Sequence, residues 1–372
     1  MQIPEITPFF LGLIIILFLK LLNDWLVTSL VIFTKSKEKP HPKVPVSIII
    51  CARNESENLI QFIPKIMEQD YPEFEVVVVD DRSIDDTQVL LKAFENKYDN
   101  LKITRVQKSE LHWAGKKFAL TIGLKSATHQ HVLLTDADCF PASDQWVKHM
   151  TAQFSKTRKI ILGYGSYQKL PGVLNKLIRS ETILIALQYL GLAKMGIPYM
   201  GVGRNLAYDK ELFFDNRGFA SHQFMPSGDD DLFINEVATP KNTNICFDQE
   251  SYTLSIPESS FSAWSQQKRR HLTTSNRYSL SSKAALIYIT LVRYIFYAGL
   301  VTSLFFHAEW LGLAVFGLNL FSLLILHYKP LKMTSSLDLM PWIPISEIFL
   351  LLYYPFLFIW NTVVSGNPWK NY

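Results

Sequence analysis

The 372-residue chain has little cysteine, little glycine and few charged residues. Its cysteines, Cys51, Cys139 and Cys246, are odd in number and lack metal-site spacing, so we expect no disulfide framework. Sixteen glycines are too few for a collagen-like repeat. Charged residues make up 19%, below the roughly 25% of soluble proteins, which disfavours both disorder and a purely soluble enzyme. The net charge of +4 is small, so nothing indicates nucleic acid as a partner.

Apolar residues are concentrated at the two ends of the chain. Residues 9–33 form an apolar run that is long enough to cross a hydrocarbon core of about 30 Å. Lys20 and Asp24 lie four residues apart within it, so they share a helix face and can pair. No basic residue precedes the run and no small-residue cleavage site follows it, which disfavours a signal peptide. We expect a transmembrane helix over residues 1–34, with a helix lying in the membrane interface as the alternative.

A C-terminal membrane region is expected over residues 283–372. Its three apolar stretches predict two or three further transmembrane helices: about 284–306, 310–327 and 343–364. Pro355 interrupts the last stretch, which is either a span or a re-entrant segment, so the side of the C-terminus stays open. Four lysines between residues 35 and 43 place the following segment in the cytoplasm. We expect an integral protein of a bacterial inner or plasma membrane.

Residues 44–260 alternate strand-like and helix-like patterns. Three runs are continuously apolar and rich in β-branched residues: 44–52, 74–81 and 131–138. Apolar residues at helical spacing lie between them, at 55–68 and 85–98. This alternation predicts an α/β domain with a mostly parallel, Rossmann-like sheet. Ligands of such sheets bind beyond the carboxyl ends of the strands, and here those ends are polar or acidic.

Two of the predicted strands end in paired carboxylates. Asp136 and Asp138 form an Asp-x-Asp sequence, in which the alternation of an extended chain aims both side chains to one side. Together with phosphate oxygens, two carboxylates hold Mg²⁺ or Mn²⁺, although an exposed turn is the alternative. Asp80 and Asp81 can accept hydrogen bonds from ribose hydroxyls or from a base N–H.

Three further polar segments are candidates for chemistry. Asp229 and Asp230 lie in a run of three carboxylates, whose repulsion suits a general base, although a helix start also favours acids. Lys116 begins a predicted helix where phosphates bind readily, or is an ordinary surface lysine. Residues 261–282 read as an amphipathic interface helix, whose basic cluster faces anionic lipid or clamps a diphosphate.

The ordered motifs resemble family 2 glycosyltransferases with the GT-A fold. They are most similar to the membrane-bound branch with cellulose, chitin and hyaluronan synthases and ceramide glucosyltransferases. The matching segments are SIIICARNE (47–55), VVVVDDRSIDDT (76–87), GKKFAL (115–120), TDAD (135–138), GDD (228–230) and QQKRR (266–270). Each motif alone is weak, but six in this order are specific, and the resemblance makes residues 44–260 a GT-A glycosyltransferase domain.

The resemblance implies a role for each matching residue on the donor side. The uridine of a UDP-sugar would be held by four of them: Arg53, Glu55, Asp80 and Asp81. Lys116 would touch the diphosphate, and Asp136 would lie between nucleotide and metal. Asp138 would be the more direct ligand of Mg²⁺ or Mn²⁺.

The resemblance also implies roles on the acceptor side. Asp230 falls at the position of the catalytic base, with Asp229 beside it. Gln266 and Arg269 match a Q-x-x-R-W element that lies near the diphosphate and the acceptor. Arg270 stands where the family has tryptophan, and in the synthases that tryptophan contacts the acceptor sugar, so processive synthesis is doubtful.

We therefore expect a membrane-bound inverting glycosyltransferase that moves a sugar from a UDP-sugar to a lipid-linked or membrane-associated glycan acceptor. The nearest alternative is a processive synthase of a β-linked polysaccharide. A sugar-nucleotide pyrophosphorylase needs a glycine-rich loop after the first strand. It is disfavoured because residues 51–55, at that place, contain no glycine. A non-catalytic membrane scaffold is disfavoured because every acidic position is intact.

Overall fold

The computed structural model describes residues 8–34, 44–107, 115–225, 227–306 and 309–363. A seven-stranded sheet has the order β3-β2-β1-β4-β8-β6-β9, and β3, β2, β1 and β4 are parallel. Its strands are β1 (Val46–Ala52), β2 (Phe74–Asp80), β3 (Leu101–Arg105), β4 (His131–Asp136), β6 (Ile160–Leu162), β8 (Leu206–Asp209) and β9 (Thr243–Ile245). A smaller sheet contains β5 (Cys139–Pro141), β7 (Gly165–Tyr167) and β10 (Thr253–Ser255). The predicted α/β fold with a mostly parallel sheet is confirmed.

Helices cover both faces of the central sheet, which explains why its strands are apolar throughout. Ile48 and Ile50 pack on the side of α2 and α3, whereas Ile49 packs on the side of α4. Gly123 lets α4 approach closely, because a Cβ there would lie 2.7 Å from Ile49 and 2.9 Å from Val79. The helices of this domain are α2 (Ser56–Met67), α3 (Thr87–Lys97), α4 (Lys116–Ser126), α5 (Trp146–Thr151), α6 (Val173–Lys194), α7 (Lys210–Asp215), α8 (Asp231–Val237) and α9 (Phe261–Leu272).

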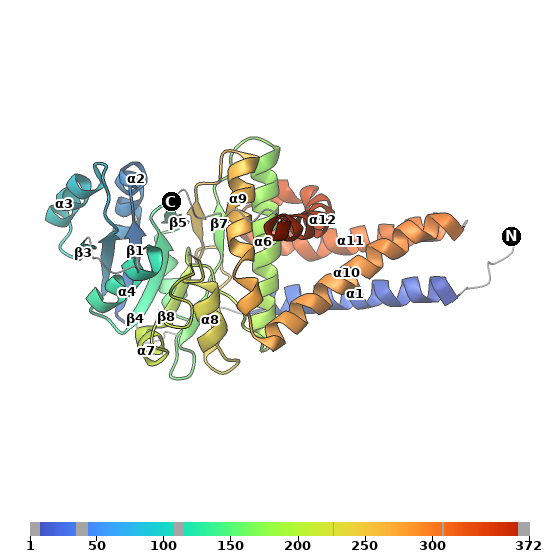
Figure 1. The fold of residues 1–372 in the computed structure, drawn as a ribbon, viewed down its shortest axis with the longest axis horizontal. Coiled ribbons are helices and arrows are strands. Elements are labelled where there is room, and N and C mark those ends of the chain that lie inside the picture. Colours follow the sequence, from blue (N-terminus) through green and yellow to red (C-terminus); the bar gives the residue numbers. More distant parts are fainter. Residues whose placement is uncertain (1–7, 35–43, 108–114, 226, 307–308, 364–372) are drawn as a thin grey trace.

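Within the part of the chain that the structure describes, four helices are long and apolar enough to cross a membrane. They are α1 (Pro8–Ile32), α10 (Leu280–Ser303), α11 (Glu309–Met333) and α12 (Trp342–Val363). Short 3-10 turns lie between helices: η1 (Ser275–Arg277), η2 (Leu304–Phe306) and η3 (Leu337–Leu339). In Figure 1, α1 and α10 extend lengthwise away from the α/β domain, which confirms one N-terminal apolar helix and a C-terminal apolar group. The lysines between residues 35 and 43 lie outside the described residues.

A buried ion network joins three of these helices. The expected pair is present, with Lys20 Nζ 2.9 Å from Asp24 on α1. Lys20 also lies 2.9 Å from Glu347 on α12, and Arg293 on α10 lies 3.1 Å from Asp24. Two positive and two negative groups therefore neutralise one another, as charges within apolar helices must. The network fixes α1, α10 and α12 relative to one another.

A second buried carboxylate joins the α/β domain to the apolar helices. Glu181, on α6, is fully buried and lies 2.7 Å from the Lys268 ammonium of α9. The same carboxylate accepts hydrogen bonds from Trp264 on α9 and from Tyr354 on α12. A buried charge of this kind is stable only when it is paired and hydrogen-bonded. Glu181 thus holds α6, α9 and α12 together beneath the sheet.

Candidate functional site

The register of the parallel strands brings the acidic strand ends to one edge of the sheet. Ala52 of β1 pairs with Asp80 of β2, and Cys51 of β1 pairs with Asp136 of β4. A pocket opens at this edge. Its lining includes Cys51, Lys116, Asp136, Gly203 and Asp229. Residues from five separate stretches of the sequence therefore share one pocket at the ligand-binding edge of the sheet.

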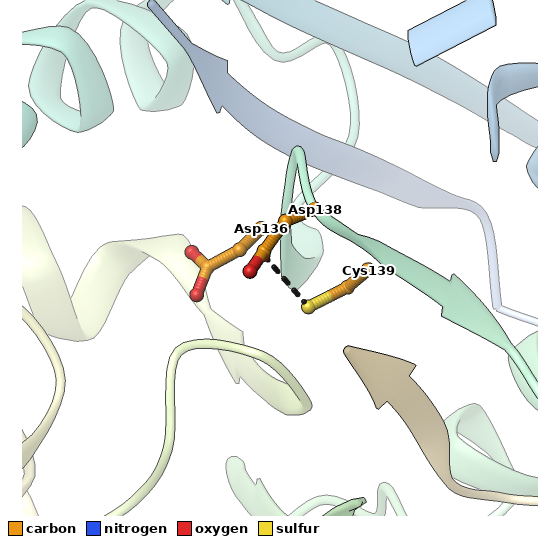
Figure 2. A group of neighbouring side chains, drawn as sticks. All are labelled: Asp136, Asp138 and Cys139. Carbon is orange, nitrogen blue, oxygen red and sulfur yellow. Dashed lines mark hydrogen bonds between the residues drawn. The ribbon is translucent and has the colours of Figure 1, made fainter. Parts of the chain in front are cut away.

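Asp136, Asp138 and Cys139 form the first cluster of this site (Figure 2). Their potential ligand atoms all lie within 4.8 Å of one another, and Cys139 Sγ donates to Asp138 Oδ1 over 3.2 Å. Burial, followed by the charge of Asp136, raises the pKa of Asp138 above its usual range. Burial also raises the pKa of the Cys139 thiol well above its ordinary value, so the sulfur stays protonated.

This donor set fits a hard divalent cation. Two carboxylates that repel one another are stabilised by a positive charge between them, and oxygen ligands suit Mg²⁺ and Mn²⁺. Cys139 donates through Sγ to the Asp138 carboxylate and so helps to orient it.

Lys116 connects this cluster to a second acidic motif. Gly115, with φ of +104°, turns the chain so that Lys116 begins α4 at the sheet edge. Its ammonium lies 2.7 Å from Asp136 and 3.0 Å from Asp229. Burial lowers the pKa of Lys116, but the two carboxylates outweigh it and hold the pKa well above its usual range. One permanent positive charge thus joins motifs that lie more than ninety residues apart in the sequence.

Asp230 lies beside Asp229 and is held by two backbone donors. Its Oδ2 accepts from the N–H of Gly203 over 2.7 Å, and its Oδ1 accepts from the N–H of Asp231 over 2.7 Å. Burial, followed by the charges of Asp229 and Asp231, raises the pKa of Asp230 to about 7. A carboxylate with a pKa near 7, fixed in orientation, is suited to accept a proton at neutral pH.

Asp231 has a structural function instead. Its Oδ2 accepts from the hydroxyls of Thr274 and Tyr278, and the Tyr278 contact measures 2.8 Å. These two residues lie between α9 and the first turn of α10. The acidic run therefore also ties the site to the segment that enters an apolar helix.

Comparison with known proteins agrees with this geometry. Residues 47–214 match the family model described as Glycosyl transferase family 2. This segment is a family 2 glycosyltransferase domain. The chain is also similar to the mannosyltransferase PcManGT from Pyrobaculum calidifontis, solved in complex with GDP-Man and Mn²⁺. That structure is 20% identical, covers 92% of this chain and 99% of its own, and superposes with a TM-score of 0.53, which shows a shared GT-A fold.

Curated relatives of the family 2 domain make different products. A poly-beta-1,6-N-acetyl-D-glucosamine synthase from Staphylococcus epidermidis is 28% identical over 151 residues, which cover 37% of this chain and 34% of the relative. A beta-monoglucosyldiacylglycerol synthase from Nostoc sp. is 30% identical over 115 residues, which cover 30% of this chain and 24% of the relative. The matched part thus spans about a third or less of these relatives' length.

The residues predicted to hold the nucleotide lie at the adjoining strand ends of the family 2 domain. Asp80 is buried and accepts from the N–H of Ser83 over 3.0 Å, and Asp81 pairs with Arg82 at 2.8 Å. Glu55 accepts from Asn58 over 2.6 Å, and its pKa is raised first by burial and then by Asp138 and Asp136. Arg53 is exposed in the same loop. Their contact with a nucleotide remains a prediction.

The predicted diphosphate and acceptor residues lie on α9. Gln266 is exposed, and Arg270 is half-buried. Arg269 points toward α12, where its Nε donates to Asn361 over 2.7 Å and its guanidinium lies 5.8 Å from the Trp360 ring centre. The structure therefore brings Lys116 and Asp136 of the family 2 domain together with Asp229 and Asp230, which lie beyond the matched residues. It directs Arg269 to the apolar helix α12.

Arg204 is a cation of the site that lies outside the six sequence motifs. Its guanidinium stacks 4.4 Å from the Tyr167 ring centre and lies 3.3 Å from Ser255 Oγ, which also contacts the Cys139 thiol at 2.8 Å. Asp138 and Asp136 are among the groups that raise its pKa despite burial. In the sequence, Arg204 lies in the segment 201–205, Gly-Val-Gly-Arg-Asn, whose two glycines predict a turn, although the segment could also shape the sugar or acceptor pocket.

Proposed function

We propose that the protein transfers a sugar from a UDP-sugar to a lipid-linked or other membrane-associated acceptor. The observation that carries this proposal is the bridge from Lys116 to Asp136 and Asp229. This bridge brings the residues that would bind the donor's diphosphate into one pocket with the residues that would take the proton from the acceptor. The family 2 domain and the apolar helices support the same reaction at a membrane surface.

The donor side of the reaction needs positive charge on the leaving diphosphate. Asp136 and Asp138 would hold Mg²⁺ or Mn²⁺, which supplies part of that charge when it is bound. Lys116 contributes a second positive charge from the start of α4, since Asp136 and Asp229 keep it protonated. Arg204 supplies a third, and its planar fork is suited to phosphate oxygens.

The acceptor side of the reaction needs a base. An acceptor hydroxyl attacks the anomeric carbon while the bond from that carbon to the diphosphate oxygen breaks, and its electrons leave with UDP. The hydroxyl proton passes to the Asp230 carboxylate. Attack from the face opposite the diphosphate inverts the anomeric carbon, so an α-linked donor yields a β-linked product. Asp229 stays paired with Lys116 and keeps the neighbouring base in place.

The connection of the site to an apolar helix supports a membrane-associated acceptor. Asp231, next to the proposed base, is bonded to the segment that leads into α10. The four lysines between residues 35 and 43 support a catalytic domain on the cytoplasmic side of a cell membrane. A processive polysaccharide synthase is the second candidate, because a curated relative makes such a polymer. Arg270, at the position of the synthase tryptophan, favours single transfer.

Incubating membranes with a panel of labelled UDP-sugars, followed by lipid extraction, tests the proposed function. We expect one labelled lipid with one added sugar, and none from membranes that contain the Asp230→Asn variant. A long polymer would favour the synthase. No transfer from any nucleotide sugar, by folded protein that still binds UDP, would contradict the proposal.

Arg204→Ala is expected to lower kcat/KM for the donor by about 10- to 100-fold, because charge-assisted hydrogen bonds contribute about 1.5–3 kcal/mol. Arg204→Lys should recover only part of this loss, since an ammonium lacks the planar fork. Arg105→Ala, on the edge strand β3, is the matched control and should leave the rate unchanged. Wild-type donor kinetics in Arg204→Ala would remove Arg204 from the site.

A further inference from the structure

Both ends of α12 contact the catalytic domain. At its start, Lys176 of α6 places its ammonium 5.3 Å from the ring centre of Trp342. Near its end, Asn361 donates through Nδ2 to the Arg269 carbonyl of α9 over 3.2 Å. A helix of 22 residues is about 33 Å long, which is the thickness of a hydrocarbon core. A helix that crossed the membrane away from the domain would leave one of these contacts unmade.

The middle of α12 follows the domain as closely as its ends. Tyr353 stacks on Trp264 of α9 with ring centres 5.2 Å apart and planes 5° apart. The next residue, Tyr354, donates to the buried Glu181 of α6. Contacts with α6 and α9 thus recur along the whole length of α12.

The other three apolar helices behave differently. Each meets the domain near one end: α1 where Val27 approaches Gly191, α10 where Ser282 accepts from Asn235 over 3.2 Å, and α11 where Leu331 joins the domain core. Their opposite ends lead away from it. In Figure 1, α1 and α10 run lengthwise, whereas α12 is seen nearly end-on. The axis of α12 therefore lies across the direction in which the other helices run.

The outward side of α12 is an apolar stripe. Its members recur at helical spacing and are exposed by 51–73%: Ile345, Leu352, Phe356, Ile359 and Val363. Glu347 is the only charged residue of the helix, and it is buried in the ion network. Helices α1 and α10 also carry exposed large apolar residues, which acyl chains would cover.

We infer that α12 lies in the plane of the membrane and does not cross it. Its apolar stripe is embedded in the acyl chains of the leaflet nearest the catalytic domain, as in interfacial helices. The membrane is then crossed by α1, α10 and α11, and the chain leaves α12 on the side of the catalytic domain. Arg269 is thereby bonded to a lipid-embedded helix, so α9 is fixed relative to the lipid surface.

Spin labels on the stripe test the orientation of α12 in the full-length protein in nanodiscs. Spin labels are placed at four positions: Ile345, Leu352, Ile359 and Val363. The ratio of relaxation by oxygen to relaxation by a water-soluble nickel complex should be the same at all four. A spanning helix would instead show greatest oxygen relaxation at Leu352 and least at its two ends, because depth changes by about 1.5 Å per residue. Labels at Leu280, Leu291 and Val301 of α10 are the control and should show that rise and fall. Poor relaxation by both agents along α12 would mean that protein covers the stripe, and would also overturn the proposal.

The side of the C-terminus provides an independent test. A single cysteine appended after Tyr372 should react with a membrane-impermeant maleimide only after right-side-out vesicles are opened. Leu304→Cys, at the far end of α10, should react before opening. The unaltered chain gives the background, because its three cysteines all lie in the catalytic domain. Reaction of the appended cysteine in sealed vesicles would show that α12 crosses the membrane.

Discussion

Asp230→Asn is expected to lower kcat by about 10²- to 10⁴-fold, which is the usual contribution of a positioned general base. The amide keeps the size of the side chain and one of its two backbone hydrogen bonds, because its single oxygen can accept from the N–H of Gly203 or of Asp231 but not from both. The affinity for UDP should change little, because Lys116 and the divalent ion that Asp136 and Asp138 would hold neutralise the donor's charge. Steady-state kinetics together with calorimetric UDP titration measure both quantities. A variant that transfers sugar at the wild-type rate would show that Asp230 is not the base.

The same residue predicts the pH dependence of the reaction. A base must be deprotonated to act, and burial with two neighbouring carboxylates raises the pKa of Asp230 to about 7. We therefore expect kcat/KM to be low in acid, to rise through an inflection near pH 7, and to level off above it. The inflection should be missing from the residual activity of Asp230→Asn. An inflection that persists in that variant would assign the titration to another group.

Asp138→Asn is expected to produce the other large effect, a loss of about 10³-fold in kcat/KM, because a divalent ion contributes several kcal/mol of charge stabilisation. In contrast to Asp230→Asn, this variant should also lose the metal-dependent part of UDP binding. Calorimetry with UDP in the presence of Mn²⁺, and again with chelator, measures that part. Asp99→Asn, an exposed carboxylate that precedes β3, is the matched control. Unchanged metal-dependent binding in Asp138→Asn would exclude the Asp136 and Asp138 pair as the metal site.

The sheet edge of this protein follows from local sequence patterns. Continuous β-branched runs indicate strands that are covered on both faces, and Ile48, Ile49 and Ile50 are buried on alternate sides as that requires. The carboxyl ends of parallel strands lie at the same edge of a sheet, so the strand order alone places Asp80 and Asp136 on either side of the end of β1. The ion pairs of Lys116 do not follow from local patterns, because their partners, Asp136 and Asp229, lie 20 and 113 residues away in the sequence. Only the fold determines that pairing.

Two other features have no local signature. Arg204 is a single arginine in a loop, and it reaches the Asp138 cluster only because β7 and β10 bring Tyr167 and Ser255 beside it. The direction of α12 is equally hidden, because length and hydropathy are the same for a spanning and an in-plane helix. The side-chain contacts of Trp342 and Asn361 with the domain decide its direction. For Arg269, the motif match predicts contact with the diphosphate and the acceptor, whereas the structure shows a hydrogen bond to Asn361 of α12. A complex with bound donor would distinguish these partners.

A structure of the full-length protein with Mn²⁺ and a non-transferable UDP-sugar analogue tests the central claim most directly. The account predicts the metal on Asp138, the diphosphate beside Lys116 and Arg204, and the Asp230 carboxylate facing the anomeric carbon within the same pocket. A donor bound elsewhere, or Asp138 and Asp230 facing separate ligand sites, would contradict it.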